Sequence, residues 1–218
     1  ARVKEFYIDL REVTHGDYWS KFYVHLESKA EKAAYLPRYI DQREGEKSLW
    51  YPDGETGEYL PLPDQMLLPV SGVDWSAAQA YAASQGKRLP TEAEWIAAFA
   101  SAPGKNEAYP WGNAYIEGLA VDKKAGVSAP LAAEGRLAGR SAFGIYDLSG
   151  NVKEWTSTSS EGKDFETVDD IPRGENVCIR GGSYDSNPDS ISSGWRWEVP
   201  ATGSRLADLG FRCAMDAD

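Results

Sequence analysis

Residues 86–95 read GKRLPTEAEW, and this stretch predicts a tight turn between two helices. Thr91 and Glu94 have the spacing of a capping box, in which each side chain bonds the other residue's backbone where a helix begins. Gly86 is typical of the residue that follows the end of a helix, because glycine adopts the left-handed conformation without strain. One helix is therefore expected to end just before Gly86, and a second to begin just after Thr91.

Short strands and long loops are predicted around these two helices. The first helix is an alanine-rich run, 77–83, capped by Asp74 or Ser76. The strand-like segments are 4–9, 142–146, 154–158, 177–184 and 209–215. The segment 30–69 is rich in proline and glycine and predicts a long covering loop, while 185–207 has no clear periodicity. We find no break in composition, so we expect a single α+β domain over residues 1–218.

Composition and charge exclude several classes of function. The 23 Lys and Arg residues against 34 Asp and Glu residues give a net charge of −11, which repels phosphate backbones and anionic lipid. We therefore expect no nucleic-acid partner. We also expect no membrane insertion, because no apolar run approaches the ~20 residues that a spanning helix needs. The chain has two Cys and two His without CxxC or HxxxH spacing, which argues against a Cys/His zinc site.

The chain resembles the formylglycine-generating enzyme family, also called sulfatase-modifying factor domains. The matching phrases, in family order, are FYID at 6–9, EVT at 12–14, VDWS at 73–76, GKRLPTEAEW at 86–95, YPWG at 109–112, FGIYDLSGNVKEWT at 143–156, RGGSY at 180–184 and LGFRCA at 209–214. The resemblance implies a C-type-lectin-like fold with short antiparallel strands, two adjacent helices and long loops. The family's usual opening strand does not precede residue 6, which suggests a trimmed chain or a domain of a longer protein.

The resemblance also shows where copper chemistry would lie. The founding enzymes hold a copper ion with two cysteine thiolates, and the matching positions here are Ser186 and Ile191. Soft thiolates select Cu(I), so we expect no copper and no formylglycine formation. The family's disulfide would join Cys213 to a position that is Ala82 here, so it cannot form. Cys178 and Cys213 either bond to each other or remain buried free thiols.

The resemblance implies one structural calcium ion. Its ligands would be the Asp147 and Glu154 carboxylates and the Gly150 and Val152 carbonyls, a set of oxygens that suits a hard cation. The alternative is a turn in which Asp147 caps backbone amides and Glu154 pairs with a lysine or arginine. A second family calcium site, between residues 113 and 127, has no recognisable ligand set here, and we do not expect it.

These observations favour a non-catalytic module that binds a protein or a small molecule. The loop 184–207 lies where the enzymes hold their active site, and we expect the ligand to contact Tyr184, Asp185, Ser186, Trp195, Arg196 and Trp197. Exposed tryptophans suit recognition, whereas buried ones would be core. The alternatives are an enzyme with altered oxidative or natural-product maturation chemistry, and a sensor domain of a larger protein. We expect a bacterial protein, and we favour a location outside the cytoplasm or at the cell surface over a cytoplasmic one.

Overall fold

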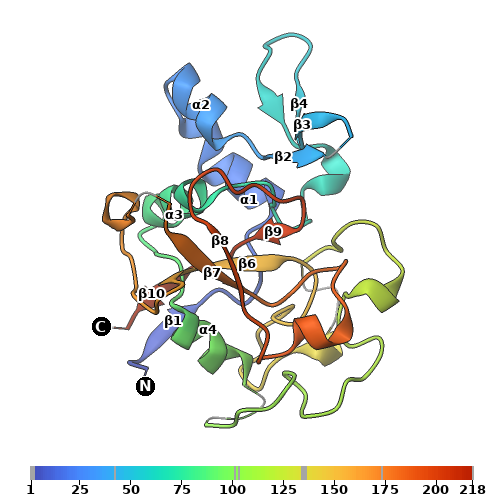
Figure 1. Cartoon of the computed structure of the whole chain (residues 1–218). Helices are drawn as coiled ribbons and strands as arrows, with labels where there is room; N and C mark the ends of the chain where they lie inside the picture. The colour runs from blue at the N-terminus through green and yellow to red at the C-terminus, as the bar shows by residue number, and fades with distance from the viewer. Residues whose placement is uncertain are drawn as a thin grey trace.

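A four-stranded sheet lies at the centre of the computed structural model, which describes residues 3–41, 43–100, 102, 104–133, 137–172 and 174–217 (Figure 1). The strand order is β8-β7-β6-β9, with antiparallel pairing except between β6 and β9. The strands are β6 (Lys153–Ser159), β7 (Asn176–Arg180), β8 (Trp197–Pro200) and β9 (Leu209–Gly210). The second half of the chain thus builds the central sheet.

Side-chain caps set where the helices begin. Asp74 rather than Ser76 caps α3 (Trp75–Ser84), because its carboxylate accepts from the Ala77 amide. Thr91 and Glu94 form the predicted capping box of α4 (Glu92–Phe99), and Gly86 has a φ of 67° in the turn between the two helices. Among the described residues, the helices α1 (His15–Lys21) and α2 (Lys29–Tyr35) precede them in the chain.

The helices α3 and α4, predicted to be adjacent, follow one another in the chain but pack against opposite faces of the central sheet (Figure 1). On the α3 face, the indoles of Trp75 and Trp155 donate to the carbonyls of Thr156 and Val73. On the α4 face, Trp95 packs in a separate apolar cluster with Phe99 and Leu148. Buried tryptophans therefore fasten both helices to β6 and its neighbours.

Short paired strands complete the fold. These are β1 (Phe6–Ile8) with β10 (Ala214–Asp216), β2 (Arg38–Asp41) with β3 (Gly45–Ser48), and β4 (Tyr51–Pro52) with β5 (Tyr59–Leu60). Single 3-10 turns are η1 (Tyr23–His25), η2 (Pro63–Gln65), η3 (Lys123–Ala125), η4 (Leu137–Gly139), η5 (Val168–Asp170) and η6 (Pro188–Ile191). In the part of the chain that the structure describes, no helix has the length and apolar character needed to cross a membrane.

Several predicted element boundaries are wrong. The long loop 30–69 contains most of α2 and two small hairpins, and the expected strand 142–146 is a turn in which the Gly144 amide donates to Ser141. The strand predicted over 177–184 ends at Arg180, because Gly181 and Gly182 have φ values of 90° and 68°. The last predicted strand is divided into β9 and β10. The aperiodic segment 185–207 holds η6 and β8.

Candidate ligand-binding site

Two neighbouring tryptophans lie at the surface where β8 begins. The ring centroids of Trp195 and Trp197 are 6.4 Å apart, and the side chains are 40% and 43% exposed. By contrast, the core tryptophans such as Trp75 and Trp155 are fully buried. We call the surface formed by Trp195, Trp197 and Lys153 the tryptophan surface. The core-packing alternative for these two indoles therefore does not hold.

Lys153 fixes one face of this surface from β6. Its Nζ lies 5.0 Å from the centroid of the Trp197 ring, a cation–π contact. The same ammonium pairs with the Asp208 carboxylate, which also accepts from the Ser183 hydroxyl at 2.7 Å. Because the Lys153 side chain is nearly buried, the Asp208 carboxylate is its essential counter-charge. The ion pair thus places the Lys153 ammonium against one face of the Trp197 indole.

The predicted residues 184–186 lie beside this ion pair. Ser186 Oγ accepts from the Ser183 amide at 2.9 Å, and Ser183 Oγ bonds Asp208, so hydroxyls connect the loop to the ion pair. The Tyr184 amide donates to Asn151, and burial raises the pKa of the Tyr184 phenol to about 12. Asp185 is exposed and 3.3 Å from the Lys123 ammonium. The loop is therefore held in place while Asp185 remains open to a ligand.

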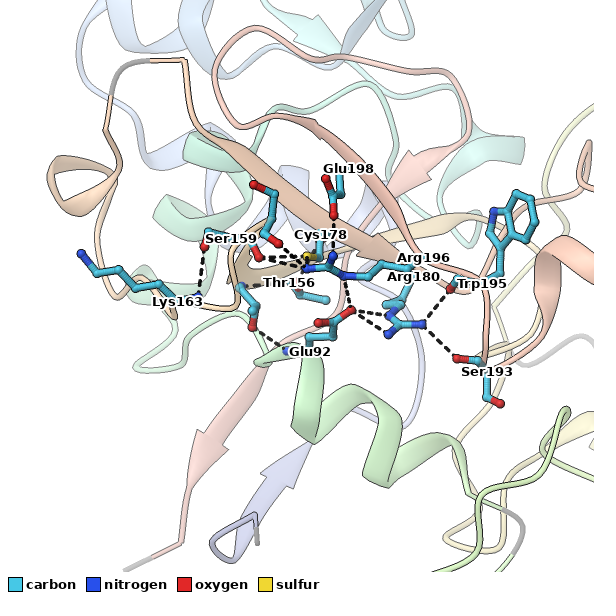
Figure 2. A network of polar contacts seen from close by, with 12 residues as sticks. Glu92, Thr156, Ser159, Lys163, Cys178, Arg180, Ser193, Trp195, Arg196 and Glu198 are labelled. Atoms are coloured by element: carbon cyan, nitrogen blue, oxygen red, sulfur yellow. Dashed lines mark hydrogen bonds and ion pairs between the residues drawn. The ribbon is translucent and has the colours of Figure 1, made fainter. Parts of the chain in front are cut away.

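Arg196 makes internal contacts rather than facing outward with the two tryptophans (Figure 2). Its Nε donates to Glu92 Oε1 at 2.8 Å, and its Nη2 donates to the Ser159 carbonyl and to Cys178 Sγ. A second ion pair joins its Nη1 to Glu198. The contacts suit a residue that positions the loop, so the predicted ligand contact through Arg196 lacks support from this geometry.

Arg180 holds the loop from β7 in a related way. Its guanidinium bonds Glu92, the first residue of α4, at 2.6 Å, and its Nη1 donates to the carbonyls of Ser193 and Trp195 (Figure 2). Glu92 thus receives both Arg180 and Arg196, and it connects α4 to the loop that carries the tryptophans. Sequence reasoning missed Glu92, although a glutamate in the first turn of a capped helix was visible.

The two positions that the resemblance implies for copper ligands carry the hydroxyl of Ser186 and the aliphatic side chain of Ile191. Ser186 is bonded within its loop, and Ile191 is fully buried at the end of η6. Cys178 and Cys213 are both free and buried, so the free-thiol alternative describes them. Burial raises the pKa of the Cys178 thiol to about 11 and that of Cys213 well above its usual value. Both sulfurs therefore stay protonated at neutral pH and are poor metal ligands.

The turn implied for calcium contains a buried ion pair. Glu154 Oε1 accepts from Arg212 Nη2 at 2.7 Å, and its Oε2 accepts from Arg212 Nε at 2.7 Å and Trp95 Nε1 at 2.9 Å. The arginine-paired alternative therefore describes Glu154. Asp147 adopts the left-handed conformation in this turn, with a φ of 55°. Position 150 requires glycine, because a Cβ there would lie 2.4 Å from the Val121 carbonyl oxygen.

A third buried carboxylate, Glu12, faces the same turn and was missed by the sequence reasoning. Its Oε1 accepts from the Asn151 amide at 3.1 Å, whereas its Oε2 has no partner among the described residues. Burial and the Asp147 carboxylate raise the pKa of Glu12 well above its usual range. Within the described ranges, no group of three or more His, Cys, Asp or Glu side chains is arranged to hold a metal ion.

Comparisons with known proteins identify the family. The family described as "Sulfatase-modifying factor enzyme 1-like domain" matches residues 1–217. The chain is 33% identical over 172 residues to the inactive C-alpha-formylglycine-generating enzyme 2 of Mus musculus, covering 72% of this chain and 52% of that protein. It is 32% identical over 188 residues to the hercynine oxygenase of Mycolicibacterium thermoresistibile, covering 78% and 41%. The chain thus spans about half the length of the curated relatives it matches.

The fold agrees with this match. The structure of PvdO from Pseudomonas aeruginosa superimposes with a TM-score of 0.68 at 21% identity, covering 97% of this chain and 80% of that one. The predicted C-type-lectin-like α+β fold of the formylglycine-generating enzyme type is thereby confirmed. On the family match and the relatives' identities, the chain belongs to the family of sulfatase-modifying factor enzyme 1-like domains.

Proposed function

We propose that this chain is a binding module that recognises a protein or small-molecule ligand through the tryptophan surface. The observation that carries the proposal is the pair of half-exposed indoles of Trp195 and Trp197, held by Lys153 and Arg180. Rigid aromatic side chains lose little entropy on binding and dominate recognition surfaces. The loop positions that carry copper ligands in the founding enzymes hold Ser186 and Ile191 here, which also favours recognition over copper chemistry.

The test is a selection on the immobilised wild type, after which the affinity of each captured ligand is measured for the wild type and for Trp197→Ala. A library of displayed protein domains and a library of small molecules are each used with immobilised protein. Ligands of this surface should bind Trp197→Ala at least ~30-fold more weakly, which corresponds to ~2 kcal/mol. Tyr51→Ala, which truncates an exposed aromatic on β4, is the matched control and should bind normally. Ligands that bind Trp197→Ala as tightly as the wild type would contradict the proposal.

A second candidate is an oxidative enzyme, favoured by the similarity to a protein named hercynine oxygenase. Of the two histidines in the chain, His15 is buried and its Nδ1 accepts from the Trp50 indole at 2.8 Å. His25 is therefore the histidine that remains to serve as a metal ligand at the surface. Iron or copper bound stoichiometrically to purified protein, together with oxygen uptake, would favour the enzyme over the binding module.

We also propose a structural calcium ion at the turn formed by Asp147, Gly150, Val152 and Glu154. The excess of buried carboxylate over guanidinium supports it, because Glu12, Asp147 and Glu154 all face Arg212. Asp147 and the two backbone carbonyls would supply the oxygen ligands, while Glu154 is already bonded to Arg212. The Gly150 amide already donates to the Gly181 carbonyl at 2.9 Å, so an ion here would lie in a turn that is bonded to the loop after β7.

A further inference from the structure

A hollow of about 360 Å³ lies between α1, the end of α3 and the chain that follows β1. Its lining starts at Asp9, and none of residues 3–8 contributes to it, so the hollow lies beyond β1 rather than beside its edge. No residue of the tryptophan surface lines it either. Its volume is in the range of small-molecule sites and far exceeds the ~30 Å³ that one water occupies in the liquid.

Tyr81 on α3 brings a hydroxyl to this hollow from the core. Its side chain is 4% exposed, and its ring packs against Tyr18, Phe22 and Phe211. The Tyr18 hydroxyl donates to the Tyr35 carbonyl at 3.0 Å, whereas the Tyr81 hydroxyl has no hydrogen-bond partner among the described residues. Because buried polar groups normally have a partner, this hydroxyl is suited to bond a molecule in the hollow.

The hydroxyl end of Tyr81 is the part that reaches the wall of the hollow. Asp9, Asp17 and Arg11 are among the groups that act on the phenol electrostatically, and all three line the hollow. Burial raises the pKa of the Tyr81 phenol well above its usual value, so the hydroxyl keeps its proton at neutral pH. Tyr81 therefore presents a hydrogen-bond donor to whatever the hollow binds.

The charged side chains around the hollow also have hydrogen-bond donors to spare. Asp17 pairs with Arg11 at 2.8 Å and with Lys21 at 2.7 Å, and Asp9 pairs with Lys87 at 2.5 Å. Each lysine ammonium carries three N–H donors, of which its ion pair uses one. Three cations thus face two carboxylates, and the hollow is locally positive in a chain whose net charge is −11.

A third acidic residue, Glu12, lines the hollow but belongs to the turn behind it. The Glu12 side chain is fully buried, and its Oε1 accepts from the Asn151 amide at 3.1 Å. Burial raises the pKa of Glu12 well above its usual range, which disfavours a negative charge there. The excess of cations at the hollow therefore stands.

We propose that this hollow binds a small organic acid, whose anionic oxygens accept from the Tyr81 hydroxyl and from the Lys21 and Lys87 ammonium groups. Hydrogen bonds from a cation to a carboxylate or a phosphate are stronger than those between neutral groups. An inorganic anion would fill only part of the volume, so the organic part of the acid occupies the rest. The proposed site does not depend on the function proposed for the tryptophan surface.

Two pairs of variants address the hydroxyl and the charge separately. Tyr81→Phe removes only the hydroxyl, and Tyr59→Phe, on β5, is its matched control because Tyr59 does not line the hollow. Lys21→Gln removes one cation, and Lys47→Gln is its control, since Lys47 also pairs with a nearby carboxylate at 2.7 Å. Both test variants leave the packing of the core unchanged and should fold.

The experiment is a thermal-shift screen of the wild-type chain, followed by calorimetric titration of the compounds that stabilise it. The panel comprises inorganic phosphate, small carboxylic acids such as succinate and phosphate monoesters such as phenyl phosphate, each organic acid beside a neutral counterpart such as succinamide or phenol. We expect organic acids of one of the two classes to bind, and the class that binds identifies the anionic group. Tyr81→Phe and Lys21→Gln should each bind these acids at least ~10-fold more weakly than their controls.

A second measurement tests the hydroxyl without any ligand. Removing a hydroxyl that has no internal partner costs no hydrogen bond, so Tyr81→Phe should melt no lower than the wild type. Tyr18→Phe should melt lower, because it loses the bond to the Tyr35 carbonyl.

Three results would overturn the proposal. One is a panel in which no acid stabilises the wild type more than its neutral counterpart does. Another is a set of acids that bind Tyr81→Phe and Tyr59→Phe equally, or that bind Trp197→Ala weakly and Tyr81→Phe normally, because these would bind elsewhere. The third is a loss of melting temperature in Tyr81→Phe as large as that in Tyr18→Phe, because the hydroxyl would then have a partner within the chain.

Discussion

Replacing Glu154 by glutamine tests how the centre of the fold is held together. The carboxylate and its partner Arg212 are both fully buried, and three N–H donors from Arg212 and Trp95 bond its two oxygens. Glutamine keeps the shape of the side chain but removes its charge. Its NH₂ group also places a donor where a carboxylate oxygen of Glu154 accepted N–H donors. The variant therefore leaves a buried guanidinium without its bidentate counter-ion.

The expected cost follows from this burial. Removing one partner of a buried ion pair typically costs ~3–5 kcal/mol, because the remaining charge stays desolvated. A domain of this size has a total stability of roughly 5–15 kcal/mol, and each kcal/mol shifts Tm by ~2–4 °C. Glu154→Gln should therefore lower Tm by about 6–20 °C. Arg212→Met should cost at least as much, since Arg212 also faces Glu12 and Asp147.

The assay is urea unfolding followed by tryptophan fluorescence and by circular dichroism, with the two transitions required to coincide. Glu198→Gln is the control, because the Glu198–Arg196 pair is partly exposed and should contribute less than ~1 kcal/mol. A loss below ~1 kcal/mol for Glu154→Gln would refute the reasoning, as would a loss equal to that of Glu198→Gln. Either result would mean that Arg212 reaches water or another acceptor when Glu154 is neutral.

Three further outcomes follow from buried groups. Burial lowers the pKa of His15 from 6.5 to about 4, so on acidification the imidazole is protonated in the unfolded chain before it is protonated in the folded one. The free energy of unfolding should therefore fall by up to ~3 kcal/mol between pH 6.5 and pH 4. Urea titrations of His15→Gln should not show this pH dependence. Cys178 and Cys213 should not react with Ellman's reagent in the native protein, and two thiols should react in denaturant; rapid native labelling would contradict their burial. Calcium at a hundredfold excess over its Kd should stabilise the wild type by ~2.7 kcal/mol relative to buffer with chelator. Asp147→Asn should not show this difference. Equal melting temperatures of the wild type in the two buffers would contradict the proposed calcium ion.

The parts of the fold that could be predicted from the sequence are those set by near neighbours in the chain. The capping box of α4 joins Thr91 to a residue three positions later, and the glycine turn before it lies within one loop. The same signal was present for α2, where Ser28 and Glu31 form a capping box, but the surrounding prolines and glycines masked it. Local capping chemistry overrides loop-like composition when the two disagree.

The candidate site was only partly predictable, because its contacts join distant parts of the chain. Trp195 and Trp197 are predicted as ligand contacts with core packing as the alternative, and they are exposed, yet the residues that hold them were missed. Lys153 and Asp208 are 55 positions apart, and Arg196 and Glu92 are 104 apart, so no pattern within one segment indicates either pair. The available hint was a lysine within the strand phrase NVKEW, where a charge requires a buried partner.

The position of Arg196 shows why a charged residue between two exposed tryptophans need not touch the ligand. Its neighbours in sequence face outward, whereas its guanidinium reaches Glu92 and the carbonyl of Ser159 on the interior side of the loop. A loop anchored in this way is ordered before binding, so a ligand does not have to supply the entropy of ordering it. Loss of the arginine should therefore weaken binding by loosening Trp195 and Trp197, even though no ligand contact is removed. The expected loss would therefore show that the contacts of Arg196 with Glu92 and Ser159 keep the two tryptophans ordered for the proposed ligand.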